Sequence, residues 1–150
     1  MQERFETFTV LINRISRDIR KIKNQEMADY HLRSVHVSCL YYIYSLGSVT
    51  SAELCEHCEE DKATISRAVD YLETNGFLLR DTGAKRYKSP LRLTDKGRDA
   101  GKRIAEKIGS ILETVSHALT ENERIEFYRC LSTISRSLEA IVQNSEEKEM

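Results

Sequence analysis

One short segment of the chain, residues 55–58, has two cysteines three positions apart with a histidine between them, in the order Cys-Glu-His-Cys. Thiolate and imidazole groups are preferred ligands of zinc, and two neighbouring thiols can also cycle between dithiol and disulfide. A third use is structural, because cysteine is among the most buried residue types and fills small apolar sites. The element that contains the segment decides between these uses.

A short helix is predicted for this segment. Thr50 and Glu53 have the spacing of a capping box, which predicts a helix of about eight residues that includes residues 55–58. A disulfide between positions i and i+3 of an intact helix fits the geometry of that bond poorly. His57 points away from Cys55 by about 160° or more, so a zinc site needs a further ligand from elsewhere. We therefore interpret Cys55 and Cys58 as packing residues, with redox sensing and metal binding as alternatives.

The composition is that of a soluble globular protein. Apolar residues make up 40% and charged residues 31% of the 150 positions, which excludes fibrous and largely disordered chains. No apolar run approaches the roughly 20 residues of a membrane span, and no signal-peptide pattern is visible. We expect a cytoplasmic protein with no membrane partner and reduced cysteines. Cys39 and Cys130 lie in apolar helical stretches and are expected in the core.

Charge is distributed unevenly, although the formal net charge is only −1. Residues 80–92 contain five basic residues and one acidic residue, a local balance of +4, whereas residues 51–60 contain four glutamates and no base. A nearly neutral total can therefore hide a basic patch suited to phosphate.

The chain is predicted to be mainly α-helical, because it has a single proline and six glycines in 150 residues. Apolar residues at alternating steps of four and three predict long amphipathic helices near both ends. Thr120 and Glu123 form a capping box that begins the last helix. Such terminal helices are expected to pair with a second copy of the chain. The apolar residues are Phe8, Ile12, Ile15, Ile19 and Ile22 near the N-terminus, Ile104, Ile108, Ile111 and Val115 in a further helix, and Phe127, Leu131, Ile134, Leu138 and Ile141 near the C-terminus.

The middle of the chain is predicted to form a helix, a turn, a second helix and a β-hairpin. This order is the pattern of a winged helix-turn-helix. Asp61 is placed to cap the second helix, which ends at Asn75 and Gly76. Strands are expected at residues 77–80 and 87–93, joined by a turn at residues 81–84. The core face of the second helix consists of Ile65, Val69 and Leu72.

The opposite face of the second helix suits the major groove of DNA. Arg67 can bind guanine O6 and N7, while the flanking hydroxyls reach phosphates or bases. In the hairpin, basic residues cluster beside Gly83, and Arg86 is expected to enter the minor groove. A merely solvated helix face and charged turn are the alternatives. The predicted DNA-binding residues are Lys62, Ala63, Thr64, Ser66, Arg67, Lys85, Arg86, Tyr87 and Lys88.

The run VTSAELCEHCEEDKATISRAVDYLETNGFLLR, followed by KRYKSPLRLTDKG, resembles the MarR family of bacterial winged helix-turn-helix transcriptional regulators. The resemblance covers about residues 48–100. It implies one domain over residues 1–150, with dimerisation helices at about 1–30 and 104–145 and a winged lobe at about 34–100. It also implies a homodimeric repressor that binds a palindromic double-stranded operator and is released by a small molecule or an oxidant. Ala84 departs from the aspartate that many relatives have in the wing.

The resemblance also points to an effector site near the helix at about residues 35–46. His36, Tyr41 and Tyr44 are the candidate effector-binding residues, and packing at the junction of the lobes is the alternative. No residue pattern indicates a cofactor, and no metal site is expected.

Three other functions are alternatives to a DNA-binding regulator. An enzyme is disfavoured, because no motif aligns a thiolate with a base and an orienting group. A redox-sensing regulator that uses Cys55 and Cys58 is a second possibility. A winged-helix protein–protein module that does not bind DNA is the third, and the acidic residues 53–60 favour it.

Overall fold

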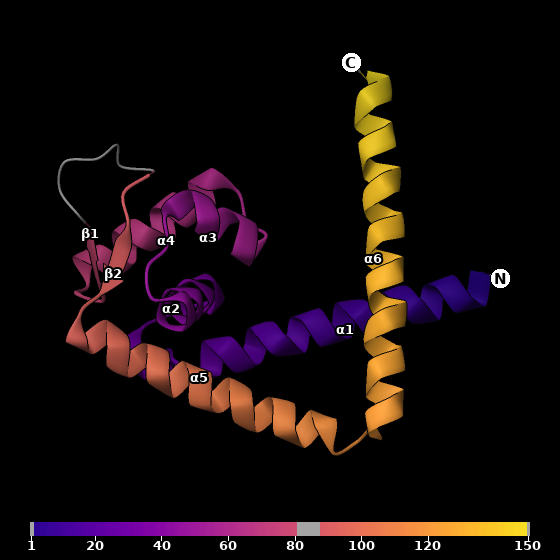
Figure 1. The fold of residues 1–150 in the computed structure, drawn as a ribbon, viewed down its shortest axis with the longest axis horizontal. Coiled ribbons are helices and arrows are strands. Elements are labelled where there is room, and N and C mark those ends of the chain that lie inside the picture. The colour runs from indigo at the N-terminus through magenta and orange to yellow at the C-terminus, as the bar shows by residue number, and fades with distance from the viewer. Residues whose placement is uncertain (1, 81–87, 150) are drawn as a thin grey trace. The chain divides into compact units, whose positions relative to one another are not determined.

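The computed structural model describes residues 2–80 and 88–149, with side chains for residues 6–80 and 88–148. As predicted, the fold is mainly α-helical with a small antiparallel hairpin (Figure 1). Within the described residues, no helix combines the length and apolar character needed to cross a membrane. The elements are α1 (Gln2–Glu26), a 3-10 turn η1 (Ala28–Tyr30), α2 (Ser34–Leu46), α3 (Ser51–Cys58), α4 (Lys62–Thr74), β1 (Leu78–Arg80), β2 (Leu91–Leu93), α5 (Asp95–Ser116) and α6 (Glu121–Glu149).

The chain divides into two compact units, residues 1–107 and residues 108–150. In the first unit, α2 is the central helix and contacts α1, α3, α4 and β2; Figure 1 shows it nearly end-on beside α3 and α4. Cys39, Leu40 and Ile43 of α2 are fully buried, which confirms the core position expected for Cys39. Burial of such side chains contributes roughly 1.5–3 kcal/mol each. The helices α3 and α4 and the hairpin are therefore built around α2.

The predicted capping boxes are present at the starts of α3 and α6. Thr50 N donates to Glu53 Oε2 at 2.8 Å, and Glu53 N donates to Thr50 Oγ1 at 3.2 Å. Thr120 and Glu123 make the same pair of bonds at 2.7 and 3.2 Å. Each box gives partners to two backbone N–H groups that a helix start leaves without them. The eight-residue length predicted for α3 is confirmed.

The junction between α4 and β1 also follows the prediction. Gly76 has a φ of +79°, which favours glycine, and Phe77 N then donates to Leu72 O at 2.8 Å. Phe77 folds back into the core and is 1% exposed. A Cβ added at Gly97, in the first turn of α5, would lie 2.0 Å from Phe77 O. The start of α5 therefore packs directly on the backbone ahead of β1.

The hairpin is shorter than predicted. β1 and β2 pair in the register Leu78↔Leu93, Leu79↔Arg92 and Arg80↔Leu91. The second strand begins at Leu91, because Pro90 lacks the N–H that a strand position would need. Val49 joins the sheet on the other side of Leu91, whose N–H donates to Val49 O at 2.8 Å. The predicted turn at residues 81–84 and residues 85–87 lie outside the described residues.

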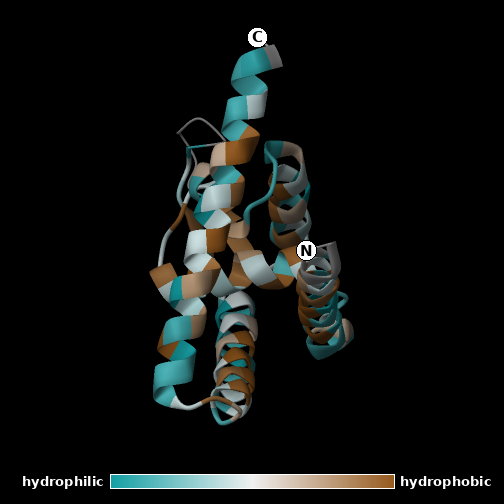
Figure 2. Ribbon diagram, turned by 90° about the vertical axis from the view of Figure 1, so that its right-hand side faces the viewer, coloured by the Kyte–Doolittle hydropathy of each residue, from teal (hydrophilic) through white to brown (hydrophobic). Residues whose placement is uncertain are grey.

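The apolar faces of the terminal helices are exposed. In α1, Ile15 and Ile19 are 51% and 48% exposed, and in α6, Leu138 and Ile141 are 49% and 62% exposed. Figure 2 shows hydrophobic positions recurring along α6. Cys130 is also exposed, so its predicted core position is wrong for the single chain. It lies on an amphipathic helix whose apolar face is open.

Candidate nucleic-acid interface

The N-terminal half of α4 presents most of the predicted contact residues. Ile65 is fully buried, and around the helix Ser66 and Arg67 are exposed, as are Lys62 and Ala63. This agrees with the helix face expected from the spacing. A helix N-terminus has a partial positive charge, because its first N–H groups have no helical acceptors. The exposed end of α4 therefore combines this partial charge with two cationic side chains.

Asp61 caps that end of α4. Its Oδ1 accepts a hydrogen bond from Thr64 N at 2.7 Å, as predicted. Hydrogen bonds from the backbone and hydroxyl of Thr64 lower the pKa of the Asp61 carboxyl, and the charge of Arg67 adds to the effect. The Thr64 hydroxyl is thus engaged in the cap and half-buried. Thr64 is therefore a predicted DNA contact whose hydroxyl already bonds to the capping carboxylate of Asp61.

A tight turn of three residues connects α3 to α4. Glu59 adopts a left-handed conformation with a φ of +53°, and Glu60 N donates to Cys55 O at 3.1 Å. Such a conformation is uncommon outside glycine, asparagine and aspartate. The turn ends at Asp61, so the cap of α4 directly follows the closing hydrogen bonds of α3. This geometry fixes the direction of α4 relative to α3.

Arg80 is part of the basic run, but it faces α4. Its guanidinium lies 3.5 Å from the carboxylate of Asp70 and 3.3 Å from that of Glu73, and its side chain is only 13% exposed. One charge of the predicted basic patch is therefore neutralised within the fold. Lys88 and Arg92 are exposed on the hairpin side. The predicted contacts Lys85, Arg86 and Tyr87 lie outside the described residues.

The structure pairs the Cys58 thiol with Cys39 of α2. Cys39 donates a hydrogen bond to Cys58, which lowers the pKa of Cys58, and the charge of Lys23 acts in the same direction. The same bond, together with burial, raises the pKa of Cys39. Sequence spacing gave no signal for this pair, because Cys39 and Cys58 belong to different helices. Cys55 is half-buried.

His57 has a packing role. It is exposed on α3, and its ring stacks on Tyr42 with centroids 5.1 Å apart and planes 22° from parallel. Among the described residues, no three His, Cys, Asp or Glu side chains are grouped as metal ligands would be.

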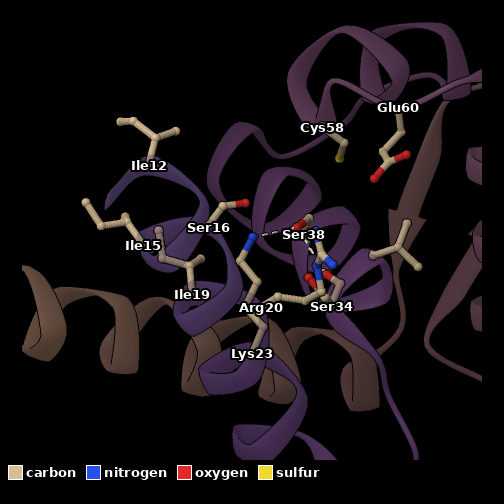
Figure 3. A pocket seen from close by; sticks show the side chains of 11 residues that line it. Ile12, Ile15, Ser16, Ile19, Arg20, Lys23, Ser34, Ser38, Cys58 and Glu60 are labelled. Atoms are coloured by element: carbon tan, nitrogen blue, oxygen red, sulfur yellow. Dashed lines mark hydrogen bonds between the residues drawn. The ribbon is translucent and has the colours of Figure 1, made fainter. Parts of the chain in front are cut away.

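A cavity of about 340 Å³ opens beside Cys58, between α1, α2 and the end of α3. Figure 3 shows the Cys58 sulfur and the Glu60 carboxylate on one side of it and basic side chains of α1 on the other. Lys23 Nζ donates to Ser38 Oγ at 3.0 Å, and Arg20 also lines the space. Isoleucines of α1 supply an apolar wall. The cavity therefore combines cationic and apolar groups with a thiol.

The predicted effector residues do not converge on this cavity. The His36 ring stacks on Tyr71 with centroids 4.5 Å apart, and its Nδ1 accepts from Arg33 N at 3.0 Å. Burial and then the charge of Arg33 lower the pKa of His36. Tyr41 and His36 line neither this cavity nor a second one of about 270 Å³, which Tyr44 does line. An effector role for the three residues stays a prediction.

A short turn between two helices, an outward-facing second helix and an adjoining two-stranded hairpin define a winged helix-turn-helix protein. Comparison with known proteins agrees. A family model described as MarR family matches residues 32–86. The uncharacterized HTH-type transcriptional regulator YwoH of Bacillus subtilis (strain 168) is 29% identical over 83 residues, which cover 55% of this chain and 61% of that protein. The match thus spans about three fifths of the relative's length.

Solved structures share the fold over most of the chain. NMB1585, a MarR family regulator from Neisseria meningitidis, aligns with a TM-score of 0.81 at 19% identity, covering 95% of this chain and 98% of that one. MepR of S. aureus in a DNA complex aligns with a TM-score of 0.77 at 18% identity, covering 87% and 97%. These results show that residues 32–86 are similar to the MarR family and that the chain has the fold of these regulators.

Proposed function

We propose that this protein is a homodimeric, sequence-specific DNA-binding transcriptional repressor. The N-terminal half of α4 would enter the major groove and the hairpin would contact the adjacent backbone. The observation that carries the proposal is the exposed Arg67 and Ser66 face of α4, opposite the buried Ile65. Arginine is the side chain best suited to bidentate recognition of guanine.

Electrostatics support α4 as the recognition element. The Asp70 and Glu73 carboxylates lie farther along α4 and form ion pairs with Arg80. The positive charge of Arg80 therefore offsets their negative charge where DNA phosphates would come near. Lys62 and Arg67 stand near the N-terminus, where the partial charge of the helix is also positive. Binding through such groups depends on counterion release and weakens as salt increases.

A second copy of the chain is the proposed partner of the terminal helices. Large contiguous apolar surfaces mark association sites, and exposed apolar side chains recur along both α1 and α6. Two copies related by a two-fold axis would present two recognition helices to a palindromic operator. A small-molecule effector is part of the proposal, and the cavity of about 340 Å³ supports it.

The second candidate function is a winged-helix module that binds a protein instead of DNA. Exposed carboxylates favour this function: Glu56 lies in α3, and Glu59 and Glu60 lie in the turn just before α4. These carboxylates would repel phosphate and attract a basic partner. In that case, the wing bases would be dispensable for binding.

Selection of bound sequences from random duplex DNA tests the proposal. A DNA-binding regulator is expected to enrich one sequence with two-fold symmetry, and a triple alanine variant of Lys85, Arg86 and Lys88 is expected to lose that enrichment. Lys102→Ala, which removes one exposed positive charge on α5, is the control. A chain that enriches no sequence, or whose triple variant selects like the parent, would favour the protein-binding module.

A further inference from the structure

Tyr71 connects α4 to the segment that leads into α2. Its hydroxyl donates to His31 O at 2.9 Å, and its ring stacks on that of His36, with centroids 4.5 Å apart and planes 15° from parallel. His36 lies in the first turn of α2, and Tyr71 lies about one helical turn after Arg67 in α4. Residues distant in the sequence thus form one contact beside the proposed recognition face.

The His36 ring also caps α2. Its Nδ1 accepts a hydrogen bond from Arg33 N at 3.0 Å, as the side chain of the third helical residue does in a capping box. An accepting Nδ1 has no proton, so the bond requires the neutral imidazole with its proton on Nε2. The contact with Tyr71 and the cap of α2 therefore share one titratable ring.

A proton on Nδ1 would break this cap. The new N–H of the ring would face the Arg33 N–H, and two donors form no hydrogen bond. The imidazolium would also lie at the N-terminus of α2, where the partial charge of the helix and the charge of Arg33 are both positive. Burial has the largest effect and lowers the pKa of His36, and the charge of Arg33 lowers it further.

Two other elements contribute side chains near the start of α2. From α4, Tyr71 faces the ring with a phenol that donates its proton to the carbonyl of His31, whose own imidazole is exposed. From α1, the neutral Asn24 side chain accepts from the first N–H of α2 at 2.7 Å, and Lys23 donates to a serine hydroxyl of α2 at 3.0 Å. Arg33 is the charge that acts on the His36 ring, and it opposes protonation.

We propose that His36 and Tyr71 form a proton-sensitive clasp between the start of α2 and the recognition helix α4. Neutral His36 caps α2 and keeps its ring against Tyr71. When Nδ1 gains a proton, the cap is lost, and the charged ring turns toward water and leaves Tyr71.

The direction of the pH dependence follows from proton linkage. The folded state lowers the pKa of His36 below the 6.5 of an unperturbed histidine, so the unfolded chain binds this proton more tightly. The clasp therefore stabilises the fold fully above about pH 6.5. Its contribution is lost as the pH falls through the lower folded value.

His36→Gln is the variant that separates the cap from the proton. Glutamine is a preferred residue at the third position of a capping box, where its Oε1 accepts from the N-cap N–H. Its side chain takes up no proton in this range. The variant is therefore expected to keep the cap at a pH at which the parent loses it.

The first test needs no DNA. NMR of the imidazole nitrogens of the full-length chain follows each histidine through a pH titration. We expect an unprotonated Nδ1 on His36 at neutral pH and a pKa below 6.5. Tyr71→Ala removes a ring that covers His36 and should raise this pKa toward 6.5, whereas Tyr71→Phe keeps the ring and should not. A protonated Nδ1 at neutral pH, or a pKa that Tyr71→Ala leaves unchanged, would overturn the clasp.

Urea unfolding at about pH 7.5 and about pH 5.5 measures the effect on stability. The unfolding midpoint of the parent should fall further than that of His36→Gln, because only the parent loses the cap. His57→Gln, which removes another stacked histidine, is the control and should keep the pH dependence of the parent. An equal fall in the parent and in His36→Gln would contradict the proposal.

An effect on DNA binding rests on the proposed function. Protonation of exposed histidines adds positive charge, which strengthens binding to phosphates as the pH falls. Opening the clasp acts in the opposite direction, because it loosens α4 one turn from Arg67. Between the same two pH values, the parent is expected to lose roughly fivefold more operator affinity than His36→Gln.

The DNA arm distinguishes the two proposals. If the parent binds no DNA at either pH, the proposed function fails, while the NMR titration and the unfolding midpoints still decide the clasp. If the parent and His36→Gln bind operator with the same pH dependence, the control of DNA binding by the clasp is overturned.

Discussion

The guanidinium of Arg80, the last residue of β1, lies 3.3 Å from the carboxylate of Glu73 in α4. Arg80 also meets Asp70, and its Nε is buried with no hydrogen-bond partner among the described residues. A largely buried charge is thus retained where β1 begins the hairpin that follows α4. We infer that the pairing sets the angle between the two proposed DNA-contacting elements.

Arg80→Ala should destabilise the lobe and weaken DNA binding together. The change leaves two carboxylates unpaired, and because both are 44% exposed we expect a loss of only about 1–2 kcal/mol in the free energy of unfolding. Urea denaturation measures it. Arg92→Ala, on the neighbouring strand, is the control and should cost less than half as much. Equal losses would contradict a special role for Arg80.

Two of the three glycines of α5, Gly97 and Gly109, should respond to alanine with opposite signs. An added Cβ at Gly97 would lie 2.0 Å from Phe77 O, whereas nothing lies within 4 Å of one at Gly109. Gly97→Ala should therefore destabilise by about 2–4 kcal/mol. Gly109→Ala should stabilise by about 0.5–1 kcal/mol, because alanine is the better helix former. Thermal unfolding of both variants checks the pair.

The Asp61 cap should make the stability of α4 depend on acid pH. The folded state lowers the pKa of Asp61 from its usual 3.8. The cap therefore stabilises above that value, and its contribution is lost as the pH falls through the lower folded value. Asp61→Ala should unfold at lower urea than the parent at pH 7. The gap between them should close below about pH 4; a gap that persists into strong acid would show that the carboxylate is not the cause.

Arg67 and Lys88 should differ in the kind of binding they provide. Arg67→Ala should weaken the selected operator by roughly 1–3 kcal/mol and relax the base preference at one position of each half-site. Lys88→Ala should weaken all sequences similarly and reduce the salt slope by about one. Fluorescence anisotropy over a salt series separates the two. Identical effects of the two substitutions would show that α4 reads no base.

A charge in the exposed face of α6 should dissociate the proposed dimer without unfolding the chain. Leu138 is 49% exposed in the single chain, so Leu138→Glu is tolerated there but would bury a charge in an interface. Sedimentation is expected to show monomers with parental helicity. Ser137→Glu, at the neighbouring residue whose hydroxyl donates to Thr133 O, is the control and should leave the dimer intact. A monomeric parent would refute the assembly itself.

Local signals in the sequence were sufficient for most of the fold. The capping pairs, the buried spacing of Ile65, Val69 and Leu72, and the glycine stop after α4 all act over a few residues and were confirmed. β2 begins several residues later than predicted, because Pro90 has no N–H to donate within a strand.

The errors and omissions involve contacts between distant residues. No spacing rule joins Arg80 to Glu73 across a helix end, or Cys39 to Cys58 across two helices. The amphipathic pattern around Cys130 predicted an apolar face but could not say whether this chain covers it. The exposed positions on one face of α4 could be predicted from the sequence. Contacts between residues of different elements could not be predicted.

Leu91 has a neighbour on each side, Val49 and Arg80. A strand with an open row of amides invites pairing with another polypeptide, and a proline beside it discourages that pairing. In this small sheet, Val49 occupies one flank of Leu91 and Pro90 immediately precedes it. The hairpin can thus project basic residues outward while its second strand is guarded against domain swapping and fibril-like aggregation.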